Sequence, residues 1–182
     1  MPMDQEFETQ VLDIDKERLI KKLRKLGAAE EEEQLQRRWV FDLDPCTAKS
    51  TGEWIRLRQV GERKPTITYK NKKGAGICDT KEIELTVDNF ETAHKLLSML
   101  PFKGNYYQEN RRHKFILKGI EFTLDTWPKI PTFLEVEAKS EEKVHEGLRL
   151  LGLEGKDAGH IGMIAIYQKY NITIHDIPVL KF

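Results

Sequence analysis

Six short segments of the chain place two like charges on either side of a single residue, and their spacing makes them candidates for ion chemistry. Because successive side chains of a β-strand point to opposite faces, each segment would put both charges on one face of a sheet. Like charges this close repel each other, so something must hold them. The segments are Glu6-Phe7-Glu8, Arg56-Leu57-Arg58, Lys70-Asn71-Lys72, Glu82-Ile83-Glu84, Arg112-His113-Lys114 and Glu135-Val136-Glu137.

These residues divide into an acidic set and a basic set, which predict two kinds of binding. Carboxylates without a partnering His or Cys suit hard cations such as Mg²⁺, Mn²⁺ or Ca²⁺, whereas Arg and Lys suit phosphates. A polyphosphate with a bridging divalent cation would neutralise both sets in one cavity. The acidic set is Glu6, Glu8, Glu82, Glu84, Asp125, Glu135 and Glu137, and the basic set is Arg56, Arg58, Lys70, Lys72, Arg112 and Lys114.

Two alternatives need no ligand. A single segment of this kind is typical of an ordinary antiparallel sheet whose charged face lies in water. Surface strands normally mix the two signs of charge, however, whereas each of these strands carries one sign. Internal salt bridges would also neutralise the charges, but each buried ion costs roughly several kcal/mol of desolvation with little net stability in return.

The hydrophobic pattern predicts about eight strands and three or four helices that position these residues. Alternation predicts strands at residues 6–14, 36–43, 54–60, 66–72, 80–87, 106–117, 120–125 and 133–138. Apolar stripes predict helices after Asp15 (Leu19, Ile20, Leu23, Leu26), after Asp88 or Asn89 (Phe90, Ala93, Leu96, Leu97, Leu100) and after Ser140 (Val144, Leu148, Leu151). A short helix at residues 160–170 and an irregular tail complete the chain.

Amphipathic helices need an apolar surface to cover, which leaves the charged face of the strands turned inward. We therefore expect an α+β fold, an eight-stranded antiparallel β-barrel with a charged lumen and helices packed outside. No linker rich in Pro, Gly or Ser divides the sequence. We expect a single domain over residues 1–182, with a core at about 4–170 and a tail at 171–182.

Composition argues against several classes of protein. Charged residues make up 33% of the chain and cancel to a formal net charge of zero. This balance disfavours a general nucleic-acid binder and a polybasic membrane-surface protein. Without a signal peptide or a run of roughly 20 apolar residues, a soluble, cytoplasmic protein is expected. The cysteines and histidines show no metal-ligand spacing, so we expect buried or idle thiols at Cys46 and Cys78 and surface or satisfied histidines, His160 among them.

Six motifs occur in an order that resembles a known family. They are Glu6-Phe7-Glu8-Thr9-Gln10, Trp54-Ile55-Arg56-Leu57-Arg58, Thr66-Ile67-Thr68-Tyr69-Lys70, Glu82-Ile83-Glu84, Leu124-Asp125-Thr126-Trp127-Pro128 and Phe133-Leu134-Glu135-Val136-Glu137. Together they resemble the CYTH domain of class IV (CyaB-type) adenylyl cyclases and thiamine triphosphatases, also called triphosphate tunnel metalloenzymes. The resemblance covers nearly the whole chain and implies a tunnel that binds triphosphate together with Mg²⁺ or Mn²⁺.

The resemblance also implies a role for each matching position. The metal set would be Glu6, Glu8, Glu135 and Glu137, with Asp125 nearby. The substrate set would be Arg56, Arg58, Lys70 and Arg112, with Lys72 as a looser match and Gln10 at a position where the family usually has Lys. The catalytic set would be Lys70, Glu82 and Glu84, because either glutamate could orient a lysine or a water molecule.

Two departures from the family pattern bear on the substrate. Gln10 can donate a hydrogen bond but carries no charge, which predicts weaker triphosphate affinity or a different substrate. The tyrosine that thiamine triphosphatases often pair with a lysine is missing from Arg38-Trp39-Val40-Phe41-Asp42.

The sequence predicts a metal-dependent hydrolase of a small triphosphate, either inorganic triphosphate, a nucleoside triphosphate or thiamine triphosphate. Water activated by metal and carboxylate would attack a phosphorus whose charge Arg56, Arg58 and Lys70 neutralise. A class IV adenylyl cyclase, with the ribose 3′-hydroxyl as the nucleophile, and a non-catalytic polyphosphate-binding module are the alternatives. The expected partner is the small-molecule substrate, with no nucleic acid and no membrane, and a homodimer stays open.

Overall fold

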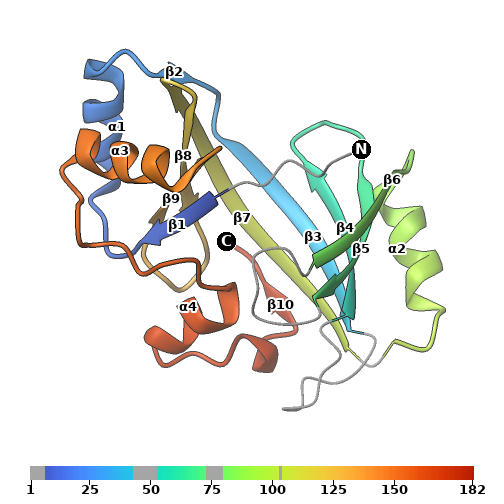
Figure 1. Ribbon diagram of the computed structural model, residues 1–182. Coiled ribbons are helices and arrows are strands. Elements are labelled where there is room, and N and C mark those ends of the chain that lie inside the picture. The colour runs from blue at the N-terminus through green and yellow to red at the C-terminus, as the bar shows by residue number, and fades with distance from the viewer. Residues whose placement is uncertain (1–6, 43–52, 73–79, 103) are drawn as a thin grey trace. The chain divides into compact units, whose positions relative to one another are not determined.

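The computed structural model describes residues 7–42, 53–72, 80–102 and 104–182, and residues 70–72 and 80–82 for their backbone only (Figure 1). The described residues form ten strands, four α-helices and one 3-10 helix. In chain order they are β1 Phe7–Val11, α1 Lys16–Lys25, β2 Ala29–Glu30, β3 Gln34–Asp42, β4 Glu53–Val60, β5 Thr66–Lys72, β6 Thr80–Thr86, α2 Phe90–Ser98, β7 Gly104–Leu117, β8 Ile120–Thr126, β9 Phe133–Ala138, α3 Glu141–Leu151, α4 Met163–Lys169, η1 Ile174–Asp176 and β10 Val179–Leu180.

The strands form one large, mainly antiparallel sheet in the order β1-β9-β8-β7-β3-β4-β5-β6, and β2 and β10 also pair with β7. The prediction of a mixed fold with a large antiparallel sheet is confirmed. The predicted strand number is wrong, because the two-residue strands β2 and β10 are too short to show an alternating pattern. Among the described strands the sheet is also not closed into a barrel, since β1 and β6 are the two ends of this order. Local alternation does not encode whether the end strands of a sheet meet.

The chain divides into two compact units, each described by itself. The first contains Met1–Gln34 and Arg111–Ile174, and the second contains Leu35–Asn110 and His175–Phe182. The single domain over residues 1–182 therefore stays a prediction. None of the described helices is long and apolar enough to span a membrane.

In the first unit, α1 and α3 cover the apolar face of β1, β8 and β9 (Figure 1). Asp15 and Ser140 cap these helices as predicted, by accepting hydrogen bonds from the backbone N–H groups of Arg18 and Lys143. Leu26 lies beyond the last residue of α1 and is 38% exposed, so its predicted place in the core is wrong. The shared core contains Val11, Leu19, Ile20, Leu23, Phe115, Ile120, Phe122, Leu124, Leu134, Val136, Ala138, Val144, Leu148 and Leu151.

In the second unit, α2 begins after the predicted cap Asn89 and packs beside β4. Its core contains Phe41, Leu57, Phe90, Ala93 and Leu97. The predicted burial of Leu96 and Leu100 is wrong, because their exposed fractions are 61% and 47%. Phe90, Ala93 and Leu97 form a narrow stripe along the helix, Leu96 lies outside it, and Leu100 follows the end of the helix.

The C-terminal residues are more regular than the sequence suggests. The predicted helix at residues 160–170 is confirmed in shorter form as α4. The prediction of an irregular tail is wrong, because β10 pairs with β7 in parallel, with Val179 opposite Tyr107 and Leu180 opposite Gln108. Leu180 is buried, which explains why this short segment is ordered.

Candidate functional site

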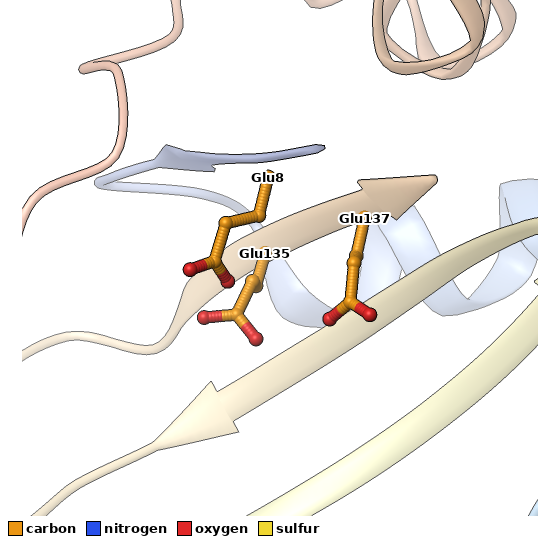
Figure 2. Close-up of side chains that lie close together, drawn as sticks. All are labelled: Glu8, Glu135 and Glu137. Atoms are coloured by element: carbon orange, nitrogen blue, oxygen red, sulfur yellow. The ribbon is translucent and has the colours of Figure 1, made fainter. Parts of the chain in front are cut away.

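Glu8 on β1 and Glu135 and Glu137 on β9 form a carboxylate cluster in the first unit (Figure 2). The antiparallel register places Glu8 opposite Glu137 and Gln10 opposite Glu135, so these side chains share the face that points away from α1 and α3. One carboxylate oxygen from each glutamate lies within 4.8 Å of those of the other two. An arrangement of three carboxylates with half-buried side chains suits a hard divalent cation.

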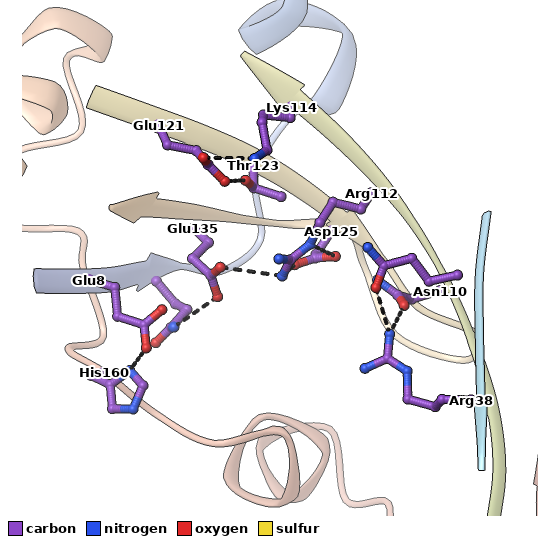
Figure 3. Close-up of polar contacts among 12 residues, drawn as sticks. Glu8, Arg38, Asn110, Arg112, Lys114, Glu121, Thr123, Asp125, Glu135 and His160 are labelled. Atoms are coloured by element: carbon purple, nitrogen blue, oxygen red, sulfur yellow. Dashed lines mark hydrogen bonds and ion pairs between the residues drawn. The ribbon is translucent and has the colours of Figure 1, made fainter. Parts of the chain in front are cut away.

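Arg112 joins this cluster to Asp125 on β8. Arg112 lies opposite Asp125 in the hairpin of β7 and β8, and its Nη2 is 2.5 Å from Asp125 Oδ2. The same nitrogen is 3.3 Å from Glu135 Oε1 (Figure 3). The side chain of Asp125 is only 2% exposed, so its carboxylate depends on this arginine for charge compensation.

The electrostatics of Glu135 fit a bound cation. Burial raises the pKa of Glu135 to about 7. The positive charge of Arg112 opposes this rise, whereas the negative charges of Asp125 and Glu8 add to it. The positive charge of Arg112 is shared between Glu135 and Asp125, so a further positive charge from Mg²⁺ or Mn²⁺ would favour the ionised form of Glu135. The donor set and its charge fit the cation that the sequence predicts.

Gln10 and His160 contact two members of the carboxylate cluster. Gln10 is 3% exposed and donates from Nε2 to Glu135 Oε2 at 3.3 Å. His160 Nδ1 lies 2.6 Å from Glu8 Oε1 (Figure 3). From the sequence, His160 is expected to be a surface or satisfied histidine, because it lies so far from Glu8 along the chain that no local pattern connects the two residues. Only the docking of residues 158–161 onto β1 brings the two together.

Lys114 is on the same face of β7 as Arg112, but it belongs to a separate pair. Its Nζ lies 2.8 Å from Glu121 Oε2, and Thr123 donates a hydrogen bond to the same carboxylate at 3.2 Å (Figure 3). Lys114 therefore acts in this structure as the counterion of Glu121.

The second unit carries the basic residues of β4. Leu57 is buried in the core beside α2, so Arg56 and Arg58 point to the opposite face of the sheet. Arg58 lies opposite Arg38, which hydrogen-bonds to Asn110 and Gln36 (Figure 3). Arg38 is not among the predicted site residues, because its position on this face follows only from the pairing of β3 with β4.

The register places the remaining predicted residues along β5 and β6. Lys70 lies opposite Glu82, and Thr68 lies opposite Glu84 and donates to Glu84 Oε2 at 2.7 Å. Glu84 is exposed, and only backbone positions are described for Lys70, Lys72 and Glu82.

The predicted acidic and basic residues are thus divided between the two units, and each unit holds members of both sets. The first unit brings together Gln10, Glu8, Arg112, Asp125, Glu135 and Glu137, and the second holds Arg56, Arg58, Lys70, Lys72, Glu82 and Glu84. Glu6, Cys46 and Cys78 lie outside the described residues. The predicted roles of all these residues, and the predicted convergence of the two sets on one lumen, stay predictions.

Three features of this structure are typical of one class of protein, the CYTH domain. They are strands with paired like charges, helices on the apolar face of the sheet and a cluster of carboxylates. Comparison with known families identifies the same class. This chain belongs to the CYTH family, because the model of the CYTH domain matches residues 4–157. No curated protein matches the chain in a search by sequence.

Solved structures share the fold at low sequence identity. The PH1012 protein of Pyrococcus horikoshii is 24% identical with a TM-score of 0.68, over 86% of this chain and 96% of that chain. A Vibrio parahaemolyticus protein provisionally described as an adenylate cyclase is 14% identical with a TM-score of 0.71, over 91% and 98%. A Hippeastrum protein, provisionally an adenylyl cyclase and reported to have a dominant triphosphatase activity, is 17% identical with a TM-score of 0.58, over 91% and 96%. Identities this low show a common fold alone.

Proposed function

We propose that this protein is a divalent-metal-dependent phosphohydrolase that acts on a small triphosphate compound in the cytoplasm. The substrate would be inorganic triphosphate, a nucleoside triphosphate or thiamine triphosphate, with no nucleic acid or membrane as partner. The observation that carries the proposal is the cluster of Glu8, Glu135 and Glu137 in a chain of the CYTH family. The dominant triphosphatase activity reported for the Hippeastrum protein supports hydrolysis rather than cyclisation.

The carboxylate cluster would hold Mg²⁺ or Mn²⁺, and the carboxylates of Glu6 and Asp125 would add negative charge near the cation. When bound, this cation would neutralise phosphate oxygens and favour attack at phosphorus. Gln10 and Arg112 both contact Glu135 and fix its orientation. The pairing of Arg112 with Asp125 holds the guanidinium group beside the cluster.

The basic residues of the second unit would bind the triphosphate. Arg56, Arg58 and Lys70 come from the neighbouring strands β4 and β5, with Lys72 further along β5. Guanidinium groups match the geometry of phosphate oxygens, and the lysine adds a point charge. Glu82 or Glu84 would orient the lysine or the attacking water.

A class IV adenylyl cyclase is the second candidate, favoured by the structural likeness to the Vibrio protein. Its nucleophile would be the ribose 3′-hydroxyl of ATP, and pyrophosphate would leave. The same charged residues would serve both reactions, because only the acceptor differs.

Product analysis tests the proposal. The protein is incubated with ATP, tripolyphosphate and thiamine triphosphate, each with Mg²⁺ or Mn²⁺. Release of free phosphate is the expected result. Formation of cyclic AMP and pyrophosphate from ATP would instead identify a cyclase, and binding without turnover would identify a polyphosphate-binding module. Absence of both binding and turnover with all three compounds would overturn all of these functions.

Replacing Arg56 by Ala should weaken triphosphate binding by about 1.5 to 3 kcal/mol, the usual contribution of a hydrogen bond to a charged group. That loss corresponds to roughly a 10- to 150-fold higher Kd at 25 °C. Calorimetric titration with tripolyphosphate measures it. Arg63→Ala is the matched control, because Arg63 is an exposed arginine in the turn between β4 and β5. Equal affinities of the two variants would remove Arg56 from the substrate-binding set.

A further inference from the structure

The outer edge of β1 is covered by residues 158–161. On its other side β1 pairs with β9. Ala158 N–H donates to the backbone oxygen of Gln10 at 2.7 Å, and Gln10 N–H donates to the backbone oxygen of Gly159 at 3.2 Å. These bonds occupy edge groups that would otherwise need water. The segment follows directly after residues 4–157, so it lies outside the part of the chain that the CYTH model matches.

The side chain of Gln10 connects this segment to the carboxylate cluster. Its Oε1 accepts a hydrogen bond from Ile161 N–H at 2.8 Å, and its Nε2 donates to Glu135 Oε2 at 3.3 Å. The residue is 3% exposed. Both ends of the amide are therefore engaged by the protein. A lysine at this position, as the family resemblance implies, has no acceptor for the Ile161 N–H group.

The same segment reaches the second carboxylate through His160. His160 Nδ1 lies 2.6 Å from Glu8 Oε1 (Figure 3). His160 stands between Gly159 and Ile161, the residues that Gln10 holds by its backbone and its side chain. Residues 158–161 thus contact two of the three clustered glutamates. They reach Glu135 indirectly through Gln10, and they reach Glu8 directly through His160.

We propose that Gln10 and His160 are positioning residues of the carboxylate cluster. His160 holds one oxygen of Glu8, and Gln10 together with Arg112 holds the two oxygens of Glu135, so the orientation of both carboxylates is fixed where a divalent cation would bind. Gln10 thereby serves the cation site instead of binding the triphosphate. The proposal rests on the proposed function only in that the cluster binds a cation. Partners that orient metal ligands typically contribute about 10- to 100-fold in metal affinity.

Binding of Mn²⁺ to the full chain without substrate tests the proposal, followed by electron paramagnetic resonance. His160→Ala should raise the Kd for Mn²⁺ by ~10-fold or more. His145→Ala is the matched control, because this half-exposed histidine is 3.7 Å from Glu141 and belongs to α3, which covers the opposite, apolar face of the sheet. His160→Asn should restore most of the affinity, because the Asn amide can place a donor near the position of Nδ1.

A second variant tests the role of Gln10. Gln10→Met keeps the size of the side chain but removes both of its hydrogen bonds, so it should also weaken Mn²⁺ binding by ~10-fold. Exchange of the Ile161 amide hydrogen should become faster in this variant. Because both residues act through residues 158–161, the double variant with His160→Ala should lose less affinity than the sum of the two single losses.

Two results would overturn the proposal: a Kd for Mn²⁺ in His160→Ala within twofold of that in His145→Ala, or no Mn²⁺ binding by the wild-type chain. Its failure is distinguishable from failure of the proposed function. If the wild-type chain binds Mn²⁺ as expected but releases no phosphate from any triphosphate, the proposed function fails and the positioning role stands. If it hydrolyses triphosphate while His160→Ala binds Mn²⁺ normally, only the positioning role fails.

Discussion

Replacing Glu135 by Gln is expected to abolish metal-dependent triphosphate hydrolysis, with a loss of more than ~100-fold in kcat, because a bound cation supplies several kcal/mol of charge stabilisation. Gln10 and Arg112 both donate hydrogen bonds to Glu135. The amide of Gln keeps the shape and one acceptor oxygen but lacks the negative charge that holds a cation. Phosphate release with tripolyphosphate and Mn²⁺ measures the loss.

The same substitution should leave the fold intact and change stability in a pH-dependent way. Because burial raises the pKa of Glu135 to about 7, its ionised form penalises the folded state above that pH. The stability that protonation of Glu135 provides is fully present below the pKa of this residue in the unfolded chain, and it is lost as the pH rises through about 7. Without metal, Glu135→Gln should therefore be more stable than wild type at pH 8 but not at pH 4.

Urea unfolding at the two pH values measures this effect, and Glu154→Gln, an exposed glutamate after α3, is the control. Full activity of Glu135→Gln would remove this residue from the mechanism. A stability difference that does not depend on pH would contradict the assigned shift in its pKa.

Replacing Arg112 by Met is expected to destabilise the protein by about 3 kcal/mol, at the lower end of the range for breaking a buried ion pair. The substitution leaves the nearly inaccessible carboxylate of Asp125 without its counterion. The arginine itself is 31% exposed, so water screens part of the interaction. The free energy of unfolding in urea measures the loss.

Two further variants test whether the loss of stability in Arg112→Met comes from the buried charge of Asp125. Lys143→Met breaks the exposed pair with Glu146 and should cost no more than ~0.5 kcal/mol. Adding Asp125→Asn to Arg112→Met should recover much of the lost stability, because the neutral amide no longer places a negative charge in this buried position. A loss below about 1 kcal/mol for Arg112→Met would show that Asp125 does not need this partner.

Predictions were correct for residues whose position is set by the sequence within a few residues of them. Alternation along β4 places Arg56 and Arg58 opposite the buried Leu57, and the turn at Lys118 and Gly119 sets the hairpin that brings Arg112 to Asp125. Lys118 and Gly119 both have positive φ, of 54° and 75°, as two-residue hairpin turns require. The capping residues Asp15 and Ser140 act as local pattern predicts.

Errors occurred where the environment of a residue depends on distant parts of the chain. Leu96 matches the helical period but lies outside the surface that α2 buries, and β10 forms only because β7 offers it an edge. Residues 158–161 dock on β1 in the same way, and this contact gives Gln10 and His160 their partners. From the sequence, Gln10 in place of the usual lysine predicts weaker substrate binding. In the structure, its side-chain amide accepts a hydrogen bond from the backbone N–H group of Ile161 and donates one to Glu135.

The sequence by itself determined which side chains share a face, because the two-residue period of a strand and the 3.6-residue period of a helix are properties of the local backbone. It also determined the family, because the ordered charged motifs are local. Only the tertiary structure decided which charged groups meet: Glu8 with His160, Arg112 with Asp125 and Glu135, and Lys114 with Glu121. Strand order, register and the docking of distant segments set these distances, and they depend on the packing of the whole unit.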